Sequence, residues 1–277
     1  MANGYGRRAV ALGLLLAIPA PALAAEPVCA PPARPFIVPL APLGISVVVK
    51  DGQAGGIYPD LLHTISAKTG CEFTTTVVPR ARLEALFEVG KADILMPATR
   101  TPQRDRYGAF IPLLDTRATL ISLAGRRAPL HSVRQLLEQR ELRLALVRGN
   151  DYGEAYQTLV KQLSAQGRVF LEADAVGVAR LIDGGIADAT IMTPTSFTAA
   201  IKGNVRVHGM LGRLRIEALD ELPWHESGIY LSHSSLTSGQ RKMLSQQLRA
   251  AYKSNAVWEN FKRYYPPEVV ALAARPR

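Results

Sequence analysis

The sequence has 277 residues and a formal net charge of +10, and it is long enough for one large or two modest domains with a substantial core. Hydrophobic residues make up 48% and charged residues 20%, a composition that excludes an intrinsically disordered chain. The basic residues are spread along the chain without aromatic interleaving or a nucleic-acid-binding motif, so we expect no nucleic-acid partner.

The first 24 residues have the three parts of a secretory signal peptide in the expected order. Arg7 and Arg8 form a positively charged start, residues 10–18 form an apolar stretch, and Ala22-Leu23-Ala24 is an A-x-A cleavage site. No later apolar run approaches the about 20 residues of a membrane-spanning helix. We therefore predict a periplasmic protein that is secreted through residues 1–24.

Two cysteines, Cys29 and Cys71, follow the predicted cleavage site. Because an exported protein meets an oxidising compartment, an even pair favours a disulfide over a metal site or a reactive thiol. Each cysteine lies just before an apparent β-strand, at residues 35–39 and 72–78. If those strands are parallel neighbours, their N-terminal ends meet and the sulfurs come within bridging distance. We predict a Cys29–Cys71 disulfide, with two buried free thiols as the alternative.

Predicted strands and helices alternate from residue 35 to about residue 210. Apolar runs typical of buried parallel strands lie at residues 36–40, 73–78, 94–96, 142–147, 169–171 and 189–192. Amphipathic helices that end at glycines lie between them, at residues 59–68, 81–89 and 175–183. This alternation predicts βαβ units and an α/β fold.

Residues 86–94 and 181–189 share one layout: the end of an amphipathic helix, a glycine, an Ala-Asp pair and a buried strand. Two such copies indicate two α/β lobes of similar build. A break in the apolar pattern at residues 125–130 is our predicted lobe boundary. We assign residues 25–125 plus 211–277 to the first lobe and residues 126–210 to the second. Such a chain crosses between the lobes twice, which gives a hinge suited to closing on a ligand.

Ligands of open α/β sheets bind beyond the carboxyl ends of the strands. Three of these ends, at residues 97–104, 148–151 and 193–196, combine hydroxyl or amide side chains with the start of a helix. The free backbone N–H groups and the helix dipole at such positions favour an anion. Arg104 would add a guanidinium group that suits a carboxylate.

Several short motifs follow one another in order along the chain: Gly56–Leu62, Gly90–Ile94, Thr101–Arg104, Ala109–Pro112, Arg148–Tyr152, Gly185–Asp188 and Gly228–Leu236. In this order and spacing they resemble family 3 of the bacterial periplasmic solute-binding proteins, the polar amino-acid-binding type. The resemblance covers nearly the whole chain after the signal peptide. It implies the type II periplasmic binding fold, with a ligand cleft between two lobes.

The resemblance also implies a ligand site. In that site Arg104 would grip the ligand carboxylate, helped by Thr99 and nearby backbone N–H groups, and the turn at residues 150–152 would face it from the second lobe. We expect ligand contacts from Ala98, Thr99, Arg104, Asn150, Asp151, Tyr152 and Thr193. Two departures stand out, because residues 43–45 lack the usual covering aromatic and neutral Thr193 replaces the acid that usually holds an ammonium group. The carboxylate half of amino-acid recognition is kept and the ammonium half is altered.

Each candidate also has a purely structural interpretation. Arg104 is then a surface arginine, and Thr99, Thr193 and Asp151 are helix caps. For the remaining charged residues at element junctions we expect structural roles (Asp60, Asp93 and Asp188) or exposed positions at the start of a helix (Arg80 and Arg82).

The sequence lacks the motifs of serine hydrolases, zinc proteases and nucleotide-binding loops, and its five histidines have no metal-ligand spacing. We therefore expect no catalytic residue, cofactor or metal. The resemblance implies a monomeric protein that closes on a small carboxylate-bearing solute and delivers it to an inner-membrane ABC permease. Two alternatives stay open. One is a periplasmic enzyme on the same fold, such as a cyclohexadienyl or arogenate dehydratase with Asp151 or Glu154 as its acid. The other is a soluble ligand sensor for a membrane histidine kinase.

Overall fold

The computed structural model describes residues 1–2, 29, 34–125, 127–253 and 256–277. The predicted signal peptide, apart from its first two residues, lies outside the described residues. Within the described part of the chain, no helix is long and apolar enough to cross a membrane.

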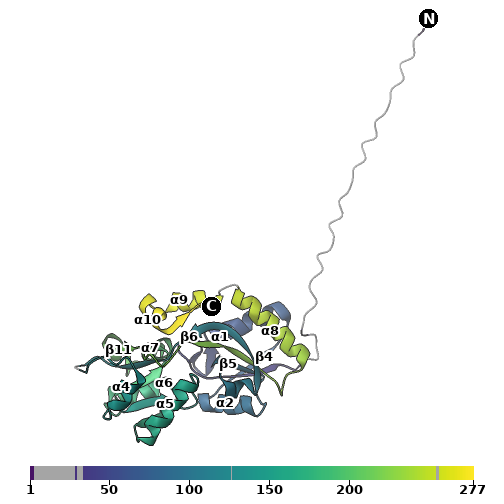
Figure 1. The fold of residues 1–277 in the computed structure, drawn as a ribbon. Helices are drawn as coiled ribbons and strands as arrows, with labels where there is room; N and C mark the ends of the chain where they lie inside the picture. Colours follow the sequence, from purple (N-terminus) through teal and green to yellow (C-terminus); the bar gives the residue numbers. More distant parts are fainter. Residues whose placement is uncertain (3–28, 30–33, 126, 254–255) are drawn as a thin grey trace.

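The first lobe contains a four-stranded sheet in the order β13-β6-β12-β5 and a parallel pair, β1 and β4. Helices α1, α2 and α8 lie around these strands (Figure 1). The strands are β1 (Phe36–Leu40), β4 (Phe73–Val77), β5 (Ile94–Thr99), β6 (Gly108–Thr116), β12 (His225–Ser232) and β13 (Ala274–Arg275), with a hairpin of β2 (Val48–Lys50) and β3 (Gln53–Gly55). The helices are α1 (Ile57–Thr69), α2 (Arg80–Glu88), α3 (Pro102–Asp105) and α8 (Ser238–Lys253).

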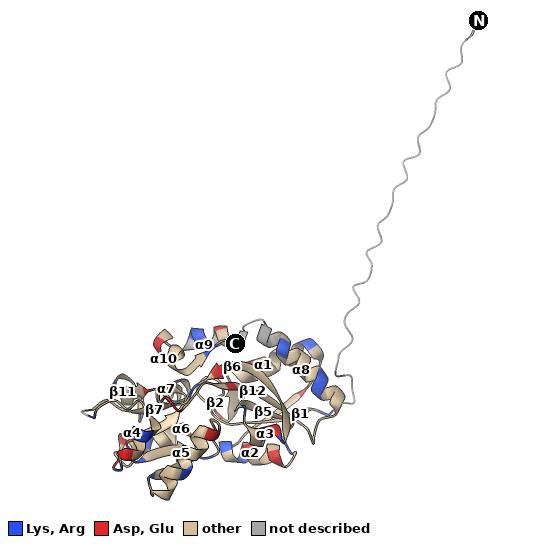
Figure 2. Ribbon diagram, viewed as in Figure 1, with Lys and Arg blue, Asp and Glu red and all other residues tan. Residues whose placement is uncertain are grey.

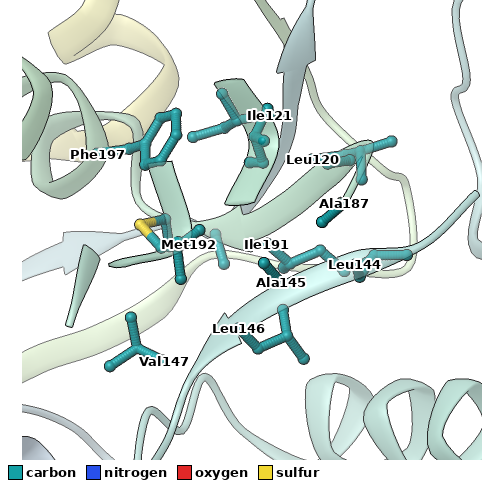
Figure 3. Close-up of a cluster of buried hydrophobic side chains, with 14 of the residues drawn as sticks. Leu120, Ile121, Leu144, Ala145, Leu146, Val147, Ala187, Ile191, Met192 and Phe197 are labelled. Carbon is teal, nitrogen blue, oxygen red and sulfur yellow. The ribbon is translucent and has the colours of Figure 1, made fainter. Parts of the chain in front are cut away.

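The second lobe is built on a five-stranded sheet in the order β11-β7-β10-β8-β9. Its strands are β7 (Thr119–Leu123), β8 (Leu144–Val147), β9 (Val169–Glu172), β10 (Ala189–Met192) and β11 (Leu214–Glu217). Its helices are α4 (Val133–Glu138), α5 (Glu154–Ala165), α6 (Ala175–Asp183), α7 (Pro194–Lys202) and the 3-10 helix η1 (His208–Arg213). Aliphatic side chains of β7, β8 and β10 form the centre of this lobe's core, and Phe197 of α7 packs on it (Figure 3).

Two further helices follow α8 at the C-terminus: α9 (Ala256–Tyr264) and α10 (Pro267–Ala273). Helix α10 packs against α7 of the second lobe, whereas β13 pairs with β6 of the first lobe. The C-terminal segment therefore contacts both lobes. Lysine and arginine residues are distributed over both lobes, including α8 (Figure 2), which agrees with a basic excess spread along the chain.

The two crossings between the lobes are real, but the predicted boundaries are wrong. Strands β7 and β11 both belong to the second lobe's sheet, although we had assigned their residues to the first lobe. The chain crosses at residues 117–118, between β6 and β7, and again at residues 218–224, between β11 and β12. The break at residues 125–130 is a loop within the second lobe, which explains why the apolar pattern stops there without a change of lobe.

The predicted disulfide is present. Cys29 and Cys71 are joined with their Cα atoms 4.9 Å apart, and the strands that follow them, β1 and β4, are parallel neighbours. Strand β4 is an edge strand with an exposed face, so only its partner β1 is buried as the apolar pattern predicted. The structural roles expected for Asp93 and Asp188 are confirmed, because each binds an arginine of its own lobe, Arg34 and Arg143.

Candidate functional site

A small cavity of about 60 Å³ lies between the two lobes. From the first lobe it is lined by the end of β5, by Tyr58 of α1 and by Ser227 of β12. From the second lobe it is lined by the turn after β8 and by the start of α7. The cavity is therefore at the carboxyl ends of β5, β8 and β10, where an α/β sheet binds its ligands.

The structure brings six of the seven predicted contact residues together around this cavity: Ala98, Thr99, Asn150, Asp151, Tyr152 and Thr193. The seventh, Arg104, lines a neighbouring cavity of about 300 Å³ between the lobes, which Asn150 and Asp151 also line. That these residues bind a ligand stays a prediction, but their convergence from two lobes is a property of the fold.

Arg104 is not a surface arginine, since only 5% of it is exposed. Its guanidinium group is held by Glu84 of α2, with Nε 3.1 Å from Oε2 and Nη2 2.8 Å from Oε1. The remaining nitrogen, Nη1, donates to the carbonyl oxygen of Thr99 at 2.8 Å. Each nitrogen of the group that we expected to grip a ligand carboxylate thus already has an acceptor within the protein.

The arginine that lines the small cavity is Arg80, the first residue of α2. We expected it to be exposed at the start of a helix; that expectation is wrong for Arg80, which is 9% exposed, and correct for Arg82. Arg80 forms an ion pair with Glu84 one helical turn later, and its Nη1 donates to the carbonyl oxygen of Pro97 at 2.8 Å. The available sequence signal was its position after the carboxyl end of β4.

Arg80, Glu84 and Arg104 form one buried cluster of charge. Burial opposes ionisation of Glu84, but the two guanidinium groups outweigh it and hold the pKa of this carboxyl below its usual value. Burial lowers the pKa of Arg80, with Glu84 opposing the change. An arginine in a protein stays charged even so. The cluster therefore has two cations and one anion.

The rest of the small cavity is rich in hydroxyl groups. Thr193 and Ser196 share a hydrogen bond of 2.6 Å between their side-chain oxygens, and Asn150 donates to the Tyr152 hydroxyl at 3.1 Å. Burial raises the pKa of Tyr152 to about 12, so this hydroxyl is neutral. Thr193 is the N-cap residue of α7 but makes no side-chain capping bond. Its hydroxyl instead bonds to the side chains of Thr195 and Ser196 in the first turn of α7, which also line the cavity.

Asp151 has a local structural role as well as a place on the cavity wall. Its Oδ1 accepts a hydrogen bond from the backbone N–H of Gly153 at 2.8 Å, while Gly153 itself is the N-cap of α5. The expected direct cap by Asp151 is therefore replaced by an Asx turn that leads into the helix. Among the described residues that line the small cavity, Arg80 and Asp151 carry charge.

The lobes meet closely around the cavity. A Cβ atom added to Gly149 of the second lobe would lie 2.8 Å from Cα of Ala81 in α2. On another side of the cleft, a Cβ added to Gly44 would lie 3.2 Å from the carbonyl oxygen of Thr195. The structure is therefore a closed arrangement in which glycines permit close backbone contact.

Residues 40–264 match the model of the bacterial extracellular solute-binding proteins, family 3. No curated protein sequence matches the chain. Among solved structures, the chain is similar to a P235GK mutant of the arginine-binding protein ArgBP from T. maritima, with 17% identity, a TM-score of 0.67, and 83% of this chain and 94% of that chain covered. It is also similar to the GluR0 ligand-binding core in complex with L-glutamate, with 16% identity and a TM-score of 0.65; the match covers 85% of this chain and 100% of that chain. A third similar structure is a histidine kinase sensor domain with similarity to periplasmic binding proteins, which is 15% identical to this chain with a TM-score of 0.65. The match covers 83% of this chain and 96% of that chain.

Proposed function

Because the chain belongs to family 3 of the bacterial extracellular solute-binding proteins, we propose that it captures a small carboxylate-bearing solute between its lobes in the periplasm and delivers it, as a monomer, to an inner-membrane ABC permease. The observation that carries the proposal is the cavity between the lobes, with a buried arginine and a wall of hydroxyl groups. Hydroxyl and amide groups suit the polar atoms of a solute, and a buried guanidinium suits its carboxylate.

The size and polarity of the site support a small solute. In the closed arrangement the cavity is about 60 Å³, and a neighbouring cavity of about 300 Å³, lined by Arg104, shares Asn150 and Asp151 with it. Binding is then a shift of an open–closed equilibrium, because a ligand that contacts both lobes stabilises the closed form.

A thermal-shift screen tests this function. The protein without residues 1–24 is mixed separately with amino acids, amines, organic acids and aromatic acids. A solute at a hundred times its Kd raises the free energy of unfolding by about 2.7 kcal/mol, which is a clear shift in Tm. A shift with carboxylate-bearing solutes supports the proposal. If amines lacking a carboxylate are the sole compounds that stabilise the protein, the carboxylate assignment is wrong.

A soluble sensor for a membrane histidine kinase is the second candidate, and the similarity to a histidine kinase sensor domain favours it. Both roles use the same closed cleft, so binding measurements alone do not distinguish them. Uptake of the radiolabelled solute in cells that lack this protein separates the two. Loss of uptake supports delivery to a permease, and normal uptake with an altered kinase response supports sensing.

We propose that the protein binds its solute without converting it. Of the two acids considered as proton donors, Glu154 is exposed and Asp151 lines the cavity. Asp151 is therefore the one residue of this pair that is placed to act on a leaving group. Incubation with prephenate or arogenate, followed by product analysis, checks this point, and turnover that Asp151→Asn abolishes would establish an enzyme instead.

A further inference from the structure

We propose that Arg80, and not Arg104, binds the anionic group of the solute, because Glu84 already occupies the guanidinium group of Arg104. This inference rests on the proposed function and specifies which residue determines its charge selectivity.

Arg104 uses three of its five N–H donors inside the protein, and these include the edge that could hold a carboxylate through two parallel bonds. Its Nε and Nη2 donate to the two oxygens of Glu84, and its Nη1 donates to Thr99. This parallel two-bond geometry is what an arginine forms with an external carboxylate. Glu84 thus takes the position on Arg104 that the resemblance to other family members assigned to the ligand.

Arg80 is in a different state. Its two terminal nitrogens bond to Pro97 and Glu84, but its Nε has no hydrogen-bond partner among the described residues. With 9% of the residue exposed, that N–H is shielded from bulk water. A buried donor without an acceptor is costly, so an acceptor that reaches Nε after a rearrangement of the Arg80 side chain would remove this cost. Arg80 lines that cavity, and Arg104 does not.

The charges of the cluster point to a single anionic group. The guanidinium groups of Arg80 and Arg104 share the one carboxylate of Glu84, so this cluster has one excess positive charge. Across the cavity, Asp151 of the second lobe supplies a negative charge. With Asp151 counted, the charges of Arg80, Arg104, Glu84 and Asp151 sum to zero, so each carboxylate of a solute adds negative charge and a second one adds repulsion from Asp151 and Glu84. The site therefore favours a solute with one carboxylate over a dicarboxylate.

Two matched variants test the inference. Arg80→Met and Arg104→Met each remove one guanidinium and leave Glu84 paired with the other, so both keep a compensated carboxylate in the core. Isothermal titration uses the monocarboxylate or amino acid that gives the largest thermal shift with the unaltered protein. We expect Arg80→Met to weaken its binding by about 10- to 150-fold, the range for a hydrogen bond to a charged group. Arg104→Met removes the same charge but no side chain that lines the small cavity, so we expect it to weaken binding by a smaller factor than Arg80→Met does.

Arg80→Lys is the third variant and covers the case in which Arg80→Met does not fold. It keeps a cation beside Glu84 but has no group equivalent to Nε–H, and we expect binding at least tenfold weaker than that of the unaltered protein. The reverse pattern, with full loss in Arg104→Met and little change in both Arg80 variants, overturns the inference and leaves the proposed function intact. If no carboxylate in the screen binds the unaltered protein, the proposed function itself fails, and the inference fails with it.

Discussion

Closure of the two lobes depends on a glycine at their interface, and Gly149→Ala tests this dependence. Gly149 follows β8 and has φ +87°, a backbone conformation that strains an L-residue by about 1–2 kcal/mol. An added Cβ would also lie 2.8 Å from Cα and 2.9 Å from the backbone nitrogen of Ala81 in the opposite lobe. To reach an ordinary carbon–carbon contact of about 3.5 Å, the lobes have to separate by roughly 0.7 Å at this point.

The backbone of α2 is held by its helical hydrogen bonds, so the separation cannot be avoided by moving a flexible side chain. Overpacking of this kind costs about 1–3 kcal/mol, and it penalises the closed form alone. A solute that needs the closed form should therefore bind about 5- to 150-fold more weakly to Gly149→Ala. Isothermal titration measures this change, and small-angle X-ray scattering with saturating solute measures whether the variant closes.

Gly185→Ala is the matched control. Gly185 has φ +68°, so the variant introduces the same kind of backbone strain in the second lobe, but an added Cβ there has no heavy atom within 4 Å. Both variants should lose a similar amount of thermal stability without solute, and Gly149→Ala should be the one that loses affinity. Equal affinities for the two variants would refute the argument that contact at Gly149 limits closure.

Three further predictions concern stability. Replacing both Cys29 and Cys71 by Ser opens a loop with a sequence separation of 42 and should lower the free energy of unfolding by about 4 kcal/mol in the chain-entropy model, measured by urea unfolding against the oxidised protein. Arg168 is buried, and its guanidinium group donates to four backbone carbonyl oxygens, those of Leu136, Leu137, Gln139 and Leu142. Arg168→Leu should therefore lower the free energy of unfolding by at least about 3 kcal/mol in the same assay. A smaller loss would mean that water replaces these bonds. Burial lowers the pKa of His225, and Asp151 opposes this change. The folded state therefore binds fewer protons than the unfolded state, so Tm should fall as the pH drops below about 6.5 toward 5.5. His225→Gln should flatten that slope, and an unchanged slope would assign the pH dependence to other groups.

Local sequence patterns were sufficient to predict much of the structure of the first lobe. The even pair of cysteines in a chain expected to be exported predicted the disulfide. The apolar runs after the two cysteines set the condition for it, a parallel pairing of β1 and β4, which the structure shows. The layout shared by residues 86–94 and 181–189 correctly marked Asp93 and Asp188. Each of these carboxylates accepts a backbone N–H at the start of a strand, from Ile37 in the first lobe and from Arg143 in the second. These features depend on neighbours in sequence or on one repeated unit.

The lobe boundary was missed because sheet membership depends on contacts distant in sequence. Strand β7 continues directly from β6 after two residues, and nothing in its composition says that it pairs with β10, about seventy residues later. The loop at residues 125–130 gave a stronger composition signal, although it lies at the far end of β7. Composition marks loops, and a lobe crossing as short as residues 117–118 leaves no such mark.

The surroundings of Arg80 and Arg104 have a similar explanation. At the start of a helix an arginine is usually exposed, but Arg80 is buried where its guanidinium group bonds to Glu84 and to the carbonyl oxygen of Pro97. Likewise, the motif that contains Arg104 carries no information about Glu84, which lies twenty residues earlier on another helix. The burial of Arg80 and the pairing of Arg104 with Glu84 both come from packing between elements, which a motif read in isolation does not contain.

The location of the charged cluster assigns different tasks to the two lobes. Arg80, Glu84 and Arg104 all belong to the first lobe, and two of them are one turn apart on α2, so their arrangement does not require closure. The second lobe contributes Asp151 and hydroxyl groups that reach the solute when the lobes meet. Under the proposed function, selection for negative charge is therefore a task of the open first lobe, whereas selection for size and polarity arises on closure. A change at Glu84 should consequently alter which anions bind, and a change at Gly149 should alter how tightly every solute is held.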